Sequence, residues 1–148
     1  MIFVDAFLKT ALIATLVLAA LGDIRKKEVT AMMIIMCGII AAADAGVMLL
    51  MHSATLSYIA LSLIPGIVML LISRVTGQGL GYGDGLIALC AAPALGIQKT
   101  AFGLILAVFL AGILSLFLLV FGKAKGKTRL PFIPFMAVGM GVMVLAKI

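Results

Sequence analysis

The sequence predicts an all-α membrane protein: a single polytopic bundle of about six transmembrane helices with no separate soluble domain. Two observations indicate this fold class. Of the 148 residues, 66% are hydrophobic and only 11% are charged, whereas soluble domains carry roughly 25% charged residues. The apolar residues also form several runs close to the roughly 20 residues that an α-helix needs to cross a bilayer. We therefore treat residues 1–148 as one transmembrane domain.

Charged and glycine-rich segments divide the chain into six expected spans. These spans are Ile2–Leu21, Thr30–Met51, Thr55–Ser73, Gly85–Ile97, Thr100–Gly122 and Pro131–Ala146. Asp5 and Lys9 interrupt the start of the first span and no small-residue cleavage site follows it, so we expect this span to be retained. The fourth span is too short to cross comfortably. It is expected to be tilted, extended through the preceding glycines or re-entrant, and a five-span arrangement is the alternative.

Basic residues predict how the bundle is oriented. Clusters of Lys and Arg follow the first and fifth spans, and Arg74 follows the third. The loops after these spans share one side of the membrane, which the positive-inside rule makes cytoplasmic. Both termini are then expected outside, together with Lys99 and His52. This topology and contact with anionic lipids of the bilayer explain the net charge of +6, so binding to nucleic acid is not expected.

The two cysteines and the methionines do not indicate a metal or redox centre. Cys37 and Cys90 lie in apolar surroundings on different spans, which is typical of inert buried thiols. The sequence has no CxxC pair or His/Cys cluster of the kind that binds metal. We therefore expect no structural disulfide, no bound metal and no other cofactor.

The chain has only five acidic residues, and their expected depths separate them. Asp5 and Asp44 belong to the outer half, with Asp44 outside or at the outer boundary. Asp23 closes the first span and Asp84 opens the fourth, both on the cytoplasmic side, so their carboxylates meet if these spans are neighbours. Glu28 lies among basic residues and is expected to be solvated.

Two interpretations of Asp23 and Asp84 remain open. Either residue can cap a helix end, where short polar side chains are favoured. An acid at membrane depth is costly, however, and is typical of ion paths, proton relays and catalytic centres. Two carboxylates that share one proton can activate water: one takes a proton from the water while its protonated partner polarises a peptide carbonyl. The sequence offers no convincing Ser/His or Cys/His pair, and its one histidine, His52, is expected on the far side.

The sequence "GYGD", Gly81–Asp84, fits the GxGD signature of intramembrane aspartyl proteases, and the chain resembles the type IV prepilin peptidases. Two further landmarks stand in the family order. In "LGDIRKKEV" basic residues follow the first aspartate, and "KTRLPFIPFMAVG" is similar to the entrance of the family's last span. The resemblance extends over nearly the whole chain. It implies a membrane-embedded aspartic endopeptidase, a hydrolase whose catalytic residues match Asp23 and Asp84.

The resemblance also implies supporting site residues. These are Gly81, Gly83, Pro131, Phe132, Pro134 and Phe135. The two glycines would shape the backbone around the second aspartate. The two prolines are expected in the first turns of the last span, where a missing backbone N–H is least harmful, and the two phenylalanines would wall the site or a substrate groove. Alternatively, "PFIPF" only starts a helix and places two aromatic rings at the membrane interface.

Several features depart from the family pattern. The family often has Ile-Pro-Asn shortly after its first aspartate, where this chain reads Val29-Thr30-Ala31, and a lysine two positions after the second, where Leu86 stands. Both positions bear on how a substrate is held. The large cytoplasmic insertion with paired cysteines of bifunctional members is also missing. The resemblance therefore implies a minimal, peptidase-only form.

The implied substrate is a prepilin or pseudopilin, which has a short basic leader, a glycine before the cut and then an apolar helix inserted in the membrane. The implied location is a prokaryotic cytoplasmic (inner) membrane, with the active site near the cytoplasmic face. A different class remains as the alternative: a small non-enzymatic transport subunit in which Asp84 is an ion or proton site. A peptidase needs Asp23 and Asp84 together, whereas such a subunit would tolerate the loss of Asp23.

Overall fold

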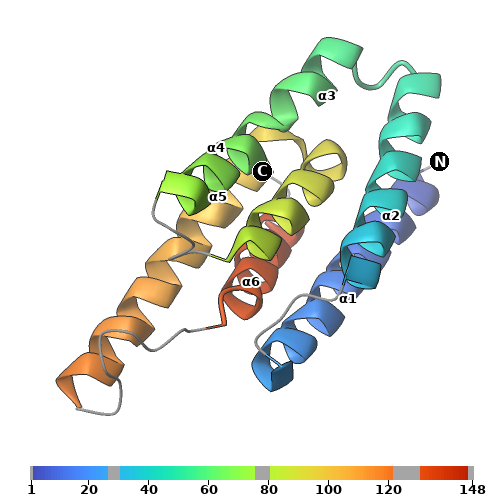
Figure 1. Cartoon of the computed structure of the whole chain (residues 1–148). Helices are drawn as coiled ribbons and strands as arrows, with labels where there is room; N and C mark the ends of the chain where they lie inside the picture. Colours follow the sequence, from blue (N-terminus) through green and yellow to red (C-terminus); the bar gives the residue numbers. More distant parts are fainter. Residues whose placement is uncertain (1, 27–30, 76–80, 122–130, 147–148) are drawn as a thin grey trace.

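The computed structural model describes residues 2–26, 31–75, 81–121 and 131–146, and the regular secondary structure in these ranges is helical. The helices are α1 (Ile2–Lys26), α2 (Ala31–Leu50), α3 (Leu56–Ser62), α4 (Ile64–Val75), α5 (Tyr82–Val120) and α6 (Ile133–Leu145). They lie side by side in one bundle (Figure 1). The predicted all-α fold is confirmed.

Within the described residues, the chain passes along the bundle six times. Four helical segments are long and apolar enough to cross a membrane, and α6 is a shorter apolar helix. The third of these segments, Leu56–Val75, combines α3 and α4. The fourth, α5, makes two passes because its ribbon turns back on itself, in the yellow part in Figure 1, where the helical geometry is interrupted at Gly96 by non-helical φ and ψ. The protein is therefore a multi-pass membrane protein with the predicted number of spans.

A proline bends the third pass. Thr55 is the N-cap of α3, and its hydroxyl oxygen accepts the N–H of Tyr58 at 3.4 Å, a role for which threonine is favoured. The helix is interrupted at Leu63, two residues before Pro65, which has no backbone N–H to donate. The chain resumes at once as α4, so the predicted single span contains a bend.

One residue reverses the chain between the fourth and fifth passes. Gly96 has φ 79° and ψ 165°, a conformation that is essentially restricted to glycine. A Cβ at this position would also clash with the hydroxyl of Tyr58 on α3. The first part of α5, residues 82–95, is only about 21 Å long at 1.5 Å per residue. The fourth pass is thus short, as predicted, and it extends back through the preceding glycines to Tyr82.

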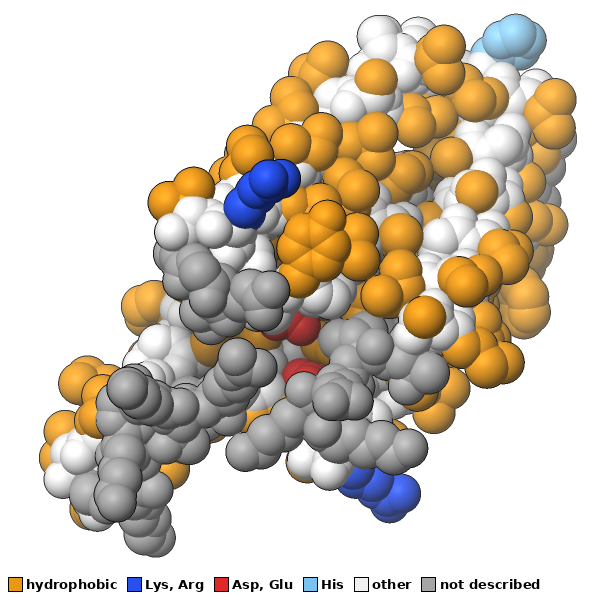
Figure 2. Space-filling view, viewed as in Figure 1, with side chains coloured by type: hydrophobic (Ala, Val, Ile, Leu, Met, Phe, Trp, Pro, Cys, Tyr) orange, Lys and Arg blue, Asp and Glu red, His pale blue; other side chains and the backbone are white. Residues whose placement is uncertain are grey.

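Small side chains form the centre of the bundle. Ala88, Ala91 and Ala94 on the first part of α5 are almost completely buried. Gly139 of α6 lies so close to α5 that an added Cβ would contact the carbonyl oxygen of Gly103. Small residues allow such close approach between helices in membranes. Many large apolar side chains lie on the outside instead and appear in orange in Figure 2, where lipid tails are as apolar as they are.

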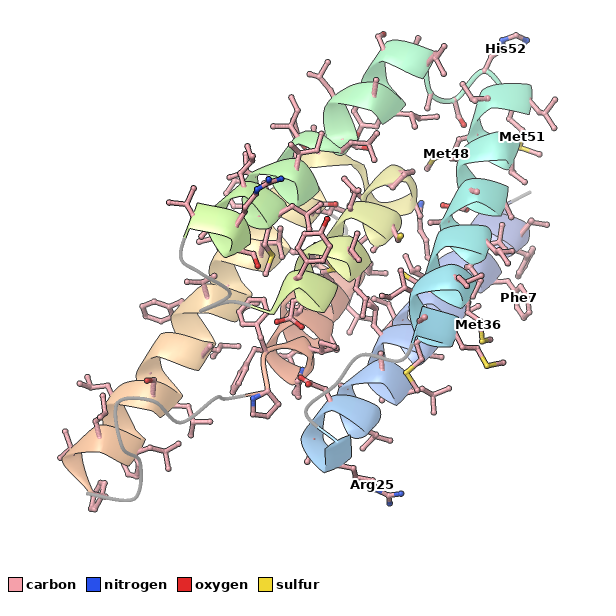
Figure 3. All side chains as sticks on the ribbon, viewed as in Figure 1. Phe7, Arg25, Met36, Met48, Met51 and His52 are labelled. Atoms are coloured by element: carbon pink, nitrogen blue, oxygen red, sulfur yellow. The ribbon has the colours of Figure 1, made fainter. Side chains whose placement is uncertain are left out.

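Arg25 and His52 mark the two ends of the bundle. Arg25, in the last turn of α1, lies at one end, and His52, after α2, lies at the other (Figure 3). The predicted positions of Glu28 and of most of the basic clusters fall outside the described residues. The end that carries Arg25 is referred to below as the Arg25 end.

Candidate active site

Asp23 lies on the inward face of α1. Leu12, Leu16, Ala19 and Asp23 are all buried, and their spacing of four, three and four residues puts them on one side of a helix. The helix continues past the predicted boundary at Leu21, so Asp23 belongs to its last turns and does not follow it. The α1 helix therefore turns the Asp23 carboxylate toward the inside of the bundle.

The carboxylate of Asp23 contacts the start of α6. Its Oδ2 atom accepts the backbone N–H of Ile133, the first residue of α6, at 3.3 Å. The N–H of Phe132 is a second backbone donor to this carboxylate. Phe132 is the N-cap of α6 and provides no side-chain cap itself. Asp23 therefore has a capping role, but the helix that it caps is α6, which lies 110 residues away in the sequence.

Asp84 lies in the first turn of α5, whose N-cap is Gly81. The N–H of Asp84 donates to the carbonyl oxygen of Gly81 at 3.1 Å, and the Asp84 carboxylate accepts the N–H of Gly81. The contact of the Asp84 carboxylate with Gly81 is one half of a capping box; the other half is missing because Gly81 has no side chain to accept the N–H of Asp84. A Cβ added to Gly81 would lie 2.8 Å from Oδ2 of Asp84. A glycine at the start of the GxGD motif therefore leaves room for the carboxylate to fold back onto its own backbone.

The two carboxylates come together at the Arg25 end of the bundle. Asp23 and Asp84 are each only 6% exposed, and they are close enough to interact electrostatically. Figure 2 shows the visible acidic atoms in red at one place, between the helix ends. The helices α1 and α5 otherwise contact each other little, while both pack against α6. The pair therefore forms where the end of α1 and the starts of α5 and α6 converge.

Two helix N-termini favour negative charge at this pair. The first N–H groups of a helix have no partners within the helix, and the helix dipole is positive at that end. The start of α5 holds Asp84, and the start of α6 donates to Asp23. These groups offset part of the cost of an ionised carboxylate at membrane depth. Two helix starts therefore lie beside two buried carboxylates that interact electrostatically.

The other predicted site residues lie at or near the starts of α5 and α6. Gly83 is half-buried in the first turn of α5. Pro134 is in the first turn of α6, as predicted, whereas Pro131 precedes the helix because α6 begins only at Ile133. Phe132 belongs to the buried core and Phe135 packs against it.

Asp44 lies in the half of α2 nearer His52, as expected. It is also fully buried within the bundle, which the sequence analysis did not predict. The signal for this burial is present in the sequence: Cys37, Ala41 and Asp44 are spaced by four and three residues, which places them on one helix face. Asp44 is therefore a third buried aspartate, separate from the Asp23–Asp84 pair.

No protein-family model, curated protein or solved structure shows a significant match to the chain. In the described part of the chain, no three or more His, Cys, Asp and Glu side chains are grouped so that they could hold a metal ion. The class of the protein, a multi-pass helical membrane protein, follows from its apolar helices. The assignment of its activity therefore depends on the aspartate pair.

Proposed function

We propose that this protein is a membrane-embedded aspartic endopeptidase that cleaves the leader peptide of type IV prepilin-like or pseudopilin precursors. The observation that carries the proposal is the pairing of Asp23 with Asp84. Two buried carboxylates from helices far apart in the sequence interact electrostatically at one end of the bundle. Such a pair can hydrolyse a peptide bond without a covalent intermediate, because it supplies both a general base and a general acid.

The backbone donors suggest how the two carboxylates divide the work. Asp23 accepts N–H groups from Ile133 and Phe132, and hydrogen bonds to a carboxylate favour its ionised form. We assign Asp23 as the base that takes a proton from the attacking water. Asp84 then carries the shared proton and polarises the scissile carbonyl. When the amine leaves, the proton taken by Asp23 passes to the amine, and the roles of the two residues exchange.

The proposed orientation places the Arg25 end on the cytoplasmic side and both termini outside. The positive-inside rule supports this orientation, since Arg25 and Arg74 end helices α1 and α4 before cytoplasmic loops. A basic leader that stays in the cytoplasm would then reach the aspartates from the same side. The apolar helix of the precursor would lie in the bilayer beside the bundle.

The competing function is a non-enzymatic transport subunit that uses Asp84 as an ion or proton site. That role does not require Asp23 beside Asp84. The electrostatic interaction of Asp23 with Asp84 favours the peptidase, in which both residues are indispensable. The two functions therefore differ in what the loss of Asp23 alone should do.

The decisive experiment replaces Asp23, Asp84 and Asp44 singly with asparagine and also combines Asp23→Asn with Asp84→Asn. Asparagine keeps the size of aspartate but cannot act as the base. We expect each single change in the pair to remove nearly all cleavage of a prepilin-like precursor by protein reconstituted in lipid. The double variant should be little worse, because residues that act as a unit are strongly non-additive.

Asp44→Asn is the matched control, because Asp44 is also a buried aspartate within a membrane helix. It should keep its cleavage activity, and all variants should accumulate in membranes at similar levels. An Asp23→Asn protein that cleaves at close to the parental rate would refute the catalytic pair. Asp84 would then have to be explained as a helix cap or an ion site.

A further inference from the structure

The helix α4 packs very closely against the first part of α5. A Cβ added to Gly66 of α4 would lie 2.5 Å from Cα of Leu89. A Cβ added to Gly85 of α5 would lie 2.7 Å from Cδ2 of Leu70. One glycine on each helix therefore allows the close approach, as small residues do in membrane bundles. Gly85 directly follows Asp84, so this contact begins at the residue next to the group that we assign as the acid.

The two contacts fix the register between the helices. They are four residues apart on each helix and run in opposite directions, so α4 and the first part of α5 are antiparallel. Because every residue of an α-helix adds the same 1.5 Å, three residues beyond Leu70 on α4 correspond to three residues before Gly85 on α5. Ser73 is therefore level with Tyr82, the first residue of α5 after its N-cap Gly81.

The side chain of Ser73 faces the inside of the bundle. Gly66, Leu70 and Ser73 are spaced by four and three residues, which puts them on the face of α4 that packs against α5. Ser73 is 0% exposed, whereas the preceding Ile72 is exposed. A hydroxyl is therefore enclosed where α5 begins, beside the turn that holds the carboxylate of Asp84.

We propose that Ser73 is a positioning residue of the aspartate pair: its hydroxyl holds the turn at Gly81 in place, and through that turn the carboxylate of Asp84. The inference rests on the proposed function. Gly81 is the group against which this carboxylate lies, because its carbonyl oxygen accepts the N–H of Asp84 and its N–H donates to the carboxylate. Ser73 thus acts on the position of the acid and does not touch the reacting atoms.

The alternative is that Ser73 is only a small side chain that lets α4 approach α5. Alanine is also small, so Ser73→Ala keeps the close approach and removes the hydroxyl. Ser62 provides a matched control, because it is also a serine with 0% exposure on the same pass. It lies in α3, before the bend at Pro65, and its hydroxyl donates to the carbonyl oxygen of Ile59.

The first test measures cleavage of a prepilin-like precursor by full-length Ser73→Ala and Ser62→Ala proteins in lipid. Rates are expressed per amount of protein that elutes as a single species, so that loss of folded protein does not appear as loss of turnover. We expect Ser73→Ala to lower kcat roughly tenfold with KM near the parental value, because a displaced acid slows the chemical step without removing contacts to the substrate. Ser62→Ala should keep both values.

A second variant covers the case in which Ser73→Ala does not accumulate. Ser73→Cys fills the space of the serine, but its S–H is only a weak donor. It should also lower kcat and leave KM near the parental value.

The second test asks whether Ser73 acts through the turn at Gly81. A Cβ at Gly81 would lie 2.8 Å from Oδ2 of Asp84, so Gly81→Ala displaces the same carboxylate directly. In a chain that already carries Gly81→Ala, adding Ser73→Ala should lower kcat by no more than about twofold, because changes that act on one group are non-additive. Independent effects would multiply and repeat the full loss.

The outcomes separate this inference from the proposed function. If the parental chain cleaves the precursor and Ser73→Ala, or Ser73→Cys in its place, has parental kcat, the role of Ser73 is overturned and the proposed function stands. Equal losses in Ser73→Ala and Ser62→Ala, or the full loss again in the Gly81→Ala chain, also overturn the role of Ser73. A parental chain that leaves the precursor intact contradicts the proposed function and this inference with it.

Discussion

Gly81 determines where the carboxylate of Asp84 can lie. Its N–H donates to that carboxylate, and its missing side chain leaves the space into which Oδ2 folds. Both effects come from one residue, because the carboxylate of Asp84, the third residue of α5, lies against the backbone of its N-cap, Gly81. Any side chain at position 81 must therefore displace the group that we assign as the acid.

We predict that Gly81→Ala lowers kcat by roughly 10- to 100-fold, since a displacement of about 1 Å at a catalytic group has effects of that order. The added Cβ would lie 2.8 Å from Oδ2 of Asp84. Turnover of a precursor peptide by the purified variant measures this. Gly46→Ala is the control, because a Cβ at Gly46 of α2 meets no atom within 4 Å. A Gly81→Ala enzyme with parental kcat would show that the carboxylate position is not set in this way.

Sequence reasoning identified both aspartates because acids are rare in this chain and costly at membrane depth. It could not identify the partner of Asp23, since the donor is a backbone N–H of Ile133, 110 residues away. Backbone groups carry no residue-specific signal, and a contact over that separation is fixed only by the packing of α6 against α1. The burial of Asp44 is readable in the sequence, because Asp44 shares one face of α2 with the buried residues Cys37 and Ala41.

At the level of helices, Gly96 allows two passes to follow each other without a loop. The sequence predicted a short fourth span and a break before the fifth, because polar residues fall at Gln98 and Lys99. It did not predict that the reversal depends on one residue at φ 79°, since a positive φ is one of several uses of glycine. It also did not predict that Tyr58 of α3 closes over this turn.

Gly96→Ala should destabilise the protein. Backbone strain alone should cost about 1–3 kcal/mol at this φ and ψ, and the new Cβ would also clash with the hydroxyl of Tyr58. The midpoint of thermal unfolding in detergent should fall relative to the parental protein. Gly112→Ala, within the same long helix, should leave the midpoint unchanged or slightly higher.

A double change separates the two contributions at Gly96. Tyr58→Phe removes the hydroxyl that the new Cβ would meet. Added to Gly96→Ala, it should restore the part of the midpoint lost to the clash but not the part lost to backbone strain. An unchanged midpoint in Gly96→Ala would contradict the assignment of the turn to this residue.

The packing of α2 against the first part of α5 can be tested by a crosslink. A Cβ added to Gly38 would lie 4.0 Å from the Cβ and 3.6 Å from the Sγ of Cys90, and Cβ atoms joined by a disulfide are about 3.5–4.5 Å apart. Gly38→Cys, made in a Cys37→Ala chain, should therefore form a disulfide with Cys90 under mild oxidation. To detect this disulfide, the chain is cut with a protease between α2 and α5 and run on a non-reducing gel. The mobility shifts if the disulfide has formed, because the two fragments then stay joined.

Gly46→Cys in the same Cys37→Ala chain is the control for this crosslink. It lies on the same helix, but a Cβ there has no atom within 4 Å. It should remain a free thiol under the same conditions. Rapid crosslinking from position 46 and none from position 38 would mean that α2 has a different register against α5.

For the whole molecule, the separation of Arg25 and His52 at opposite ends provides a test of orientation (Figure 3). We predict that Arg25→Cys is protected from an impermeant thiol reagent in intact cells, while His52→Cys is labelled, because the proposed orientation places the basic end in the cytoplasm. Both changes are made in a chain with Cys37→Ala and Cys90→Ala. Disruption of the membrane should make Arg25→Cys reactive. Labelling of position 25 and protection of position 52 in intact cells would reverse the proposed orientation and place the aspartates away from a cytoplasmic leader.

The hydrogen bond between Asp23 and Ile133 also has a consequence for biosynthesis. The two residues are 110 positions apart, so at synthesis rates of about 5–20 residues per second the acid emerges roughly 5 to 20 s before its partner. During that interval α1 is already in the bilayer, while the helix that Asp23 caps does not yet exist. The environment of Asp23 is therefore completed only when the segment around Ile133 has been made and inserted. Under the proposed function, a ribosome-bound chain would be unable to act on neighbouring precursors.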